Sequence, residues 1–156
     1  MSGRTKSAVD AELDFDGLLT LGGFQVGMVH SIVSTRLEAR LKPLGLSPKL
    51  ASVLWLASAN PGIQQVTLTR VFHVNRATVN AFIRELKAKG LIELEQLEHD
   101  KRSLGIVLTA QGREILPVMK AAVQRFEDEF AEAVGRDNAA LFSKVLENLK
   151  TRSPGS

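Results

Sequence analysis

The sequence predicts a mainly helical protein that carries one small β-hairpin. Apolar side chains recur every three or four residues over most of the 156-residue chain, which is the spacing of amphipathic helices. The period changes to strict alternation within residues 91–108, as expected for two short strands. A turn signal at residues 60–62 and a glycine at 135 separate the helical stretches. Helices on both sides of a single hairpin follow from these observations.

Composition narrows the class of protein. Hydrophobic residues make up 44% and charged residues 24% of the chain, an ordinary globular balance, and no apolar run is long enough to span a bilayer. Residues 1–16 lack the apolar segment of a signal peptide, so we expect a cytoplasmic protein with no membrane partner. The chain has no cysteine, and His30, His73 and His99 lack metal-ligand spacing, so we expect neither a metal nor another cofactor.

The N-terminal third predicts a flexible tail and a long helix. Residues 1–16 are small and polar, and we expect them to be flexible. An apolar stripe from residue 17 to about residue 44 then predicts one amphipathic helix. Its members are Leu18, Leu21, Val29, Ile32, Val33, Leu37 and Leu41. Gly22, Gly23 and Gly27 weaken the pattern and indicate either a break near its start or close contact with another backbone.

Clear start and stop signals bound the next two helices. Ser47 and Pro48 suit the N-cap and the first helical position, and Asn60-Pro61-Gly62 ends the helix that they begin. The expected inner face of this helix is Leu50, Val53, Leu54 and Ala57. A short helix over about residues 64–72 follows.

The helix that begins after Asn75 has the best-defined ends in the chain. Asn75 is a good N-cap, Val74 and Val79 occupy the two positions of a hydrophobic staple, and Gly90 suits the position just after the end. The expected buried stripe is Val79, Phe82, Ile83 and Leu86. Residues 70–90 also carry five basic side chains against Glu85 alone: Arg70, Arg76, Arg84, Lys87 and Lys89. This local charge suits phosphate binding, although a solvated helix face would look the same.

The hairpin and the C-terminal helices complete the prediction. Strands over residues 91–97 and 104–108 flank a polar tip, and a hairpin with a basic tip after two short helices is the order of a winged helix–turn–helix. Thr109 caps a long helix whose expected stripe is Ile115, Met119, Ala122, Phe126, Phe130 and Ala133. Pro117 within that stripe predicts a kink or a late start. Gly135 breaks the pattern, and Asp137 starts a last amphipathic helix.

Five short motifs in this order resemble the MarR family over about residues 44–116. They are Leu46-Ser47-Pro48, Asn75-Arg76-Ala77-Thr78-Val79, Leu86-Lys87-Ala88-Lys89-Gly90-Leu91-Ile92, Asp100-Lys101-Arg102-Ser103 and Leu108-Thr109-Ala110-Gln111-Gly112-Arg113. The resemblance implies a homodimer built from a helical dimerisation region, residues 17–45 and 110–152. It further implies that residues 46–109 form a winged helix–turn–helix domain that binds a pseudo-palindromic operator in double-stranded DNA. Ala81 departs from the pattern, because many relatives carry arginine there, and implies a different operator preference.

The first turns of a recognition helix present side chains to base edges in the major groove. Here these side chains are Arg76, Ala77, Thr78 and Asn80. Arg76 can pair with guanine, Asn80 suits adenine, and Ala77 or Thr78 can contact a thymine methyl. Arg84 is read either as a phosphate contact or as plain surface charge.

The polar tip of the hairpin supplies a second set of DNA contacts. Arg102, on a projecting hairpin, can enter a narrow and electronegative minor groove, and Asp100 can hold it by a bidentate pair. Lys101 adds a phosphate contact. A surface salt bridge between Asp100 and Arg102 is the alternative.

The resemblance also implies a small aromatic or phenolic effector bound between the dimerisation helices and the winged domain. Residues on elements that could line such a cavity are Phe24, Met28, His30, Ser34, Arg36 and Trp55. His30 has an alternative role as a surface or dimer-interface residue, and Trp55 has one as a core residue.

Four functions compete at this point. The favoured one is a DNA-binding repressor that its effector releases. A ligand-independent DNA-binding regulator and a winged-helix protein-interaction module that has lost DNA binding are the alternatives. An enzyme is the least favoured, because the sequence contains no nucleophile elbow, phosphate loop or metal-ligand spacing.

Overall fold

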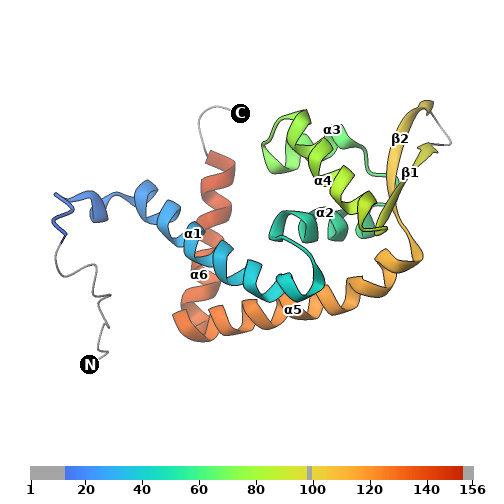
Figure 1. Cartoon of the computed structure of the whole chain (residues 1–156). Helices are drawn as coiled ribbons and strands as arrows, with labels where there is room; N and C mark the ends of the chain where they lie inside the picture. Colours follow the sequence, from blue (N-terminus) through green and yellow to red (C-terminus); the bar gives the residue numbers. More distant parts are fainter. Residues whose placement is uncertain (1–12, 98–99, 153–156) are drawn as a thin grey trace. The chain divides into compact units, whose positions relative to one another are not determined.

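The computed structural model describes residues 13–97 and 100–152, with the side chains of residues 100–102 and 152 outside the description (Figure 1). The chain divides into two compact units, Met1–Arg36 and Leu37–Ser156, which we consider in turn. Within the described part of the chain, no helix combines the length and the apolarity that a membrane span requires.

The first unit contains a 3₁₀ turn, η2 (Leu18–Thr20), and most of α1 (Gly22–Leu41). Leu21 between them has extended backbone, so the helix expected from residue 17 is broken near its start, where the glycines weaken the apolar pattern. A second 3₁₀ turn, η3 (Lys42–Leu44), follows α1. The first unit leaves large apolar side chains exposed: Leu13, Leu18, Leu19, Leu21, Val26, Met28, Val29 and Ile32.

Three helices form the centre of the second unit: α2 (Pro48–Ala59), α3 (Gln65–Phe72) and α4 (Arg76–Ala88). The predicted Ser47 cap is confirmed, since its hydroxyl accepts a hydrogen bond from the backbone N–H of Leu50 at 3.3 Å. The predicted inner face of α2 is buried throughout, and it joins residues from α4 and the hairpin in one core. The fully buried large side chains of this core are Leu41, Leu50, Val53, Leu54, Leu68, Val79, Leu86, Ile106 and Met119.

The hairpin consists of β1 (Ile92–Leu97) and β2 (Asp100–Leu108), which pair antiparallel with Ile92 opposite Leu108. The expectation that the second strand begins at residue 104 is wrong. Pairing of Leu97 with Asp100, across an irregularity in the register, extends β2 four residues further towards the tip. Apolar alternation is absent from residues 100–103, so the pattern alone does not reveal this extension.

The loop after α2 is joined to the hairpin. Ile63 forms an isolated bridge with Ile106, and hydrogen bonds run in both directions, from Gly62 N–H to the Ile106 carbonyl and from Ile106 N–H to the Ile63 carbonyl, each 3.0 Å long. Gly105 makes the close approach possible, because a Cβ there would lie 2.6 Å from the Gly62 Cα. The hairpin is therefore anchored to the helices at its base.

Two further helices, α5 (Ala110–Val134) and α6 (Arg136–Arg152), complete the second unit (orange and red in Figure 1). Pro117 predicted a kink or a late start, and the late start is wrong, since α5 begins at Ala110 and continues through the proline. The Thr109 cap fixes this start, and burial of Met119 in the core holds the helix beyond the proline. After Gly135, α6 begins one residue earlier than expected.

One cross-helix ion pair joins the end of α1 to α5 inside the second unit. The Arg40 guanidinium donates to the Glu129 carboxylate at 2.5 Å. This hydrogen bond, with the attraction between the two charges, raises the pKa of Arg40 above its ordinary value. Both side chains are largely exposed, so the pair orients two helix segments and adds little to stability.

Candidate nucleic-acid interface

Helix α4 is seated on the core by one face and presents the other to solvent. Val79, Ile83 and Leu86 are buried, with exposed fractions of 0, 3 and 0%. The predicted contact residues Arg76, Ala77, Asn80 and Arg84 are exposed, and Thr78 is half-buried. The structure therefore brings these five residues together on and beside the outward side of one helix, as the 3.6-residue period requires.

The start of α4 is held by a double hydrogen bond. The Asn75 Oδ1 atom accepts from the backbone N–H of Thr78 at 2.9 Å and from the Thr78 hydroxyl at 3.0 Å. The first bond is the predicted N-cap. Sequence reasoning missed the second bond, although a threonine three residues after an asparagine cap is a recognisable signal for it.

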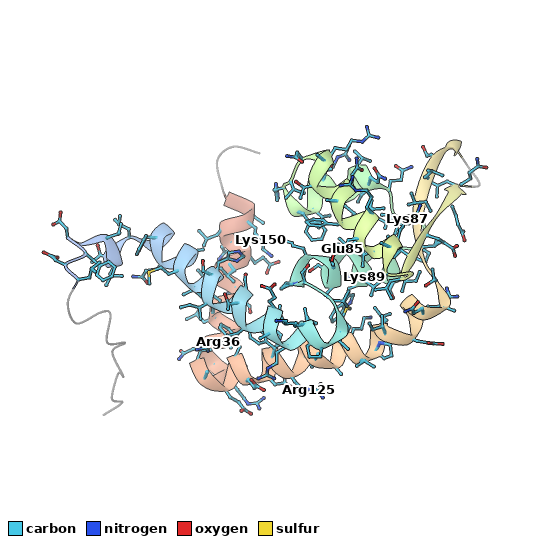
Figure 2. All side chains as sticks on the ribbon, in the orientation of Figure 1. Arg36, Glu85, Lys87, Lys89, Arg125 and Lys150 are labelled. Atoms are coloured by element: carbon cyan, nitrogen blue, oxygen red, sulfur yellow. The ribbon has the colours of Figure 1, made fainter. Side chains whose placement is uncertain are left out.

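Most of the positive charge on α4 is available to an external anion. Among the described residues, the ion pair between Lys89 and Glu85 at 3.6 Å is the one that involves this helix. Figure 2 labels Glu85 and Lys87 on the second half of this helix and Lys89 just after its end. Arg76, Arg84 and Lys87 are exposed and have no such carboxylate partner in the described part of the chain. Exposed guanidinium and ammonium groups of this kind suit phosphate oxygens.

A contact that sequence reasoning missed ties α2 to the helix before α4. The Lys49 ammonium lies 5.2 Å from the centre of the Phe72 ring, within the range of a cation–π interaction. Phe72 is the last residue of α3, and His73, in left-handed backbone, directs the chain towards α4. No spacing rule links a lysine and a phenylalanine 23 positions apart, so only the tertiary structure reveals this contact.

The residues predicted at the hairpin tip are placed by their backbone alone. Asp100, Lys101 and Arg102 begin β2 and thus lie at the far end of the hairpin from the core. Their side chains, and His99 as a whole, lie outside the described residues. The pairing of Asp100 with Arg102 and the minor-groove role of Arg102 remain predictions.

The predicted effector residues fall in both units. Phe24, Met28, His30, Ser34 and Arg36 are on α1 in the first unit (Arg36 is labelled in Figure 2). The Ser34 hydroxyl lies 3.5 Å from the His30 Nε2 atom, one helical turn away. Trp55 is on α2 in the second unit. It is 37% exposed rather than part of the buried core, and the Lys120 ammonium lies 4.7 Å from the centre of its ring.

The second unit contains an open cavity of about 420 Å³ beside the hairpin. Its lining combines apolar and charged side chains: Ala57, Ser58, Pro61, Glu93, Glu95, Val107, Leu108 and Arg113. The six predicted effector residues are all absent from this lining. The cavity is therefore not the predicted effector site.

Comparisons with known proteins find similarity to MarR-type transcriptional regulators. The family model for the MarR family matches residues 46–104. The chain is 26% identical over 127 residues to the HTH-type transcriptional repressor Rv2887 of Mycobacterium tuberculosis, covering 81% of this chain and 91% of that protein. A solved structure of Rv2887 in complex with salicylic acid has a TM-score of 0.66 at 26% identity and covers 83% of this chain and 96% of that one.

The transcriptional repressor CouR is similar over more of the chain. Its structure bound to a 23-mer DNA duplex has 30% identity and a TM-score of 0.83, and covers 89% of this chain and 99% of that one. Its structure bound to p-coumaroyl-CoA has 29% identity and a TM-score of 0.84, and covers 91% of this chain and all of that one.

Proposed function

Because this chain belongs to the MarR family of transcriptional regulators, we propose that it is a homodimeric DNA-binding repressor whose operator affinity a small aromatic effector lowers. The observation that carries the proposal is the arrangement of α4. One face is anchored in the core by Val79, Ile83 and Leu86, and the rest of the helix surface presents arginine, asparagine and small residues to solvent. A helix held in this way can enter a major groove.

We propose that different parts of the chain bind DNA and form the dimer. Residues 46–109 bind DNA, while residues 17–45 and 110–152 form the dimer. Support for the dimer comes from α6, where Leu141, Phe142, Val145 and Leu149 are 38–61% exposed along one side of the helix. A second copy would remove such a stripe from water. Two copies then place their α4 helices in grooves about 34–36 Å apart on a pseudo-palindromic operator.

The proposed effector class is based on the ligands of two similar proteins. CouR is solved with p-coumaroyl-CoA and Rv2887 with salicylic acid, which are a thioester of an aromatic acid and an aromatic acid. We propose that Phe24, Met28, His30, Ser34, Arg36 and Trp55 take part in binding a ligand of this class. The coupling requires that the effector bind the DNA-free conformation more tightly than the DNA-bound one.

Fluorescence anisotropy tests the proposed function. The protein is titrated onto its own upstream intergenic DNA and onto a scrambled duplex, over a range of salt concentrations. Salicylate, p-coumarate, p-coumaroyl-CoA and CoA are then added separately to the complex. We expect a preference for the upstream DNA and its loss with at least one aromatic compound but not with CoA alone. Sequence-preferring binding that no compound weakens would favour the ligand-independent regulator.

Single substitutions should separate base reading from phosphate attraction. Arg76→Ala and Arg102→Ala are each expected to raise the Kd for the operator about tenfold, because each removes a guanidinium that reads a groove. The Kd for scrambled DNA should rise much less. Arg125→Ala, on the exposed surface of α5, is the matched control for loss of one charge. If the double variant Arg76→Ala/Arg102→Ala bound DNA as the unaltered protein does, the winged domain would be a protein-interaction module instead.

A further inference from the structure

The centre of the outward face of α4 is made of alanine. At 100° per residue, the positions opposite the buried Val79, Ile83 and Leu86 are occupied by Ala77, Ala81 and Ala88, with Arg84 among them. All four are exposed. An alanine side chain offers one methyl group and no hydrogen-bonding atom, so this surface can approach a groove closely but cannot hydrogen-bond to base edges.

Thr78, at the edge of this face, has already used its only hydroxyl hydrogen. The Asn75 oxygen that accepts this hydrogen also accepts the backbone N–H of Thr78, and a nitrogen in its place could not do so. The orientation of the Asn75 amide is therefore fixed, and the Thr78 hydroxyl must be the donor. While this bond is kept, Thr78 offers DNA its methyl group and its hydroxyl lone pairs.

We propose that α4 recognises its operator chiefly through thymine methyl groups that pack against Ala77 and Ala81. Thr78 contributes by contacting methyls or base amino groups, and Asn75 is the positioning residue that limits it to these contacts. The arginines of α4 that lie beside these alanines, chiefly Arg76, then recognise guanine. The inference rests on the proposed DNA-binding function and specifies which chemical groups of the operator are read.

The energetics favour a measurable effect. Burying one methyl group against an apolar surface changes affinity by about fourfold. Two thymine methyls in each half-site would therefore account for far more than the scatter of a binding measurement. The thymine methyl lies in the major groove, so its removal leaves minor-groove contacts of the hairpin in place.

The test uses a duplex that the wild-type protein enriches from a randomised DNA library. This duplex is resynthesised with uracil in place of every thymine, which removes the methyl groups and keeps the base pairing. We expect at least about a tenfold loss of affinity. Single uracil substitutions then locate the contacted thymines. At one of these positions Ala81→Gly should no longer distinguish thymine from uracil, whereas Ala121→Gly, an exposed alanine of α5, should retain the discrimination.

A second selection tests the role of Asn75. Asn75→Asp keeps an acceptor for both hydrogen bonds and should enrich the same sequence as the wild type. Asn75→Gly preserves much of the capping preference but frees the Thr78 hydroxyl to donate. It should enrich a base pair with an acceptor, such as guanine, at the position that Thr78 contacts. A purely structural cap would change affinity without changing this base preference.

The outcomes separate the two levels of the proposal. If the library yields no enriched duplex, the DNA-binding function itself is wrong. If an enriched duplex binds equally well with uracil and with thymine, DNA binding stands and thymine-methyl recognition is overturned. If Ala81→Gly remains as sensitive to uracil as the wild type, the methyl contact lies elsewhere and the assignment to α4 is overturned.

Discussion

Replacing Gly112 with alanine is expected to destabilise the second unit by about 3 kcal/mol, at the upper end of the usual range for overpacking. A Cβ at this position would lie 2.0 Å from the carbonyl oxygen of Leu91. That carbonyl cannot easily retreat, because it accepts a hydrogen bond from the Thr109 N–H at 3.1 Å. The Gly112 N–H itself donates to the Thr109 hydroxyl oxygen at 3.0 Å, so the start of α5 would have to move away from the hairpin.

Urea unfolding followed by circular dichroism measures this effect. Gly23→Ala is the matched control, since a Cβ on that residue would meet nothing within 4 Å. Alanine is also the better helix former, so the control should leave the free energy of unfolding unchanged or raise it slightly. Equal unfolding midpoints for Gly112→Ala and the unaltered protein would show that the hairpin and α5 do not pack as closely as described.

Replacing Leu149 with aspartate is expected to raise the dimer dissociation constant by more than about a hundredfold. Leu149 is 51% exposed in the single chain and belongs to the apolar stripe of α6. In the proposed dimer this position would place a carboxylate against apolar partners, where an ionised group is strongly unfavourable. Sedimentation velocity over a concentration series reports the change, and circular dichroism should show intact helices.

The aspartate itself needs a control. Lys144→Asp introduces the same carboxylate at an exposed position off the apolar stripe and should leave the dimer intact. Phe130→Asp should also disrupt the dimer. Phe130 is half-buried, however, and the centre of its ring lies 5.9 Å from the centre of the Phe142 ring. That variant would therefore disturb the packing of α5 on α6 as well. If the Leu149→Asp protein remained dimeric at the same low concentrations as the unaltered protein, the proposed dimerisation region would be wrong.

The buried and exposed sides of α4 were predictable because they depend on local chemistry, and the DNA contacts of the exposed side stay a prediction. The 3.6-residue period of Val79, Ile83 and Leu86 determines which side is buried, and therefore that Ala77, Ala81 and Arg84 lie on the opposite, exposed side. The hairpin tip was predictable as a position in the chain, and its Arg102 contact stays a prediction. Five of the predicted effector residues lie on α1 in the first unit and Trp55 lies on α2 in the second, and their role in ligand binding stays a prediction.

Local residue patterns are enough to predict the order of the elements and where most of them begin. Ser47, Asn75 and Thr109 each cap a helix as predicted, since a cap needs only atoms within three residues of itself. Other features depend on contacts between distant segments: the extra length of β2, the continuation of α5 through Pro117, the close packing of Gly112 on Leu91, and the contacts of Lys49 and Arg40. Each depends on two backbones or side chains brought together by burial of a shared core, and no local pattern encodes that proximity.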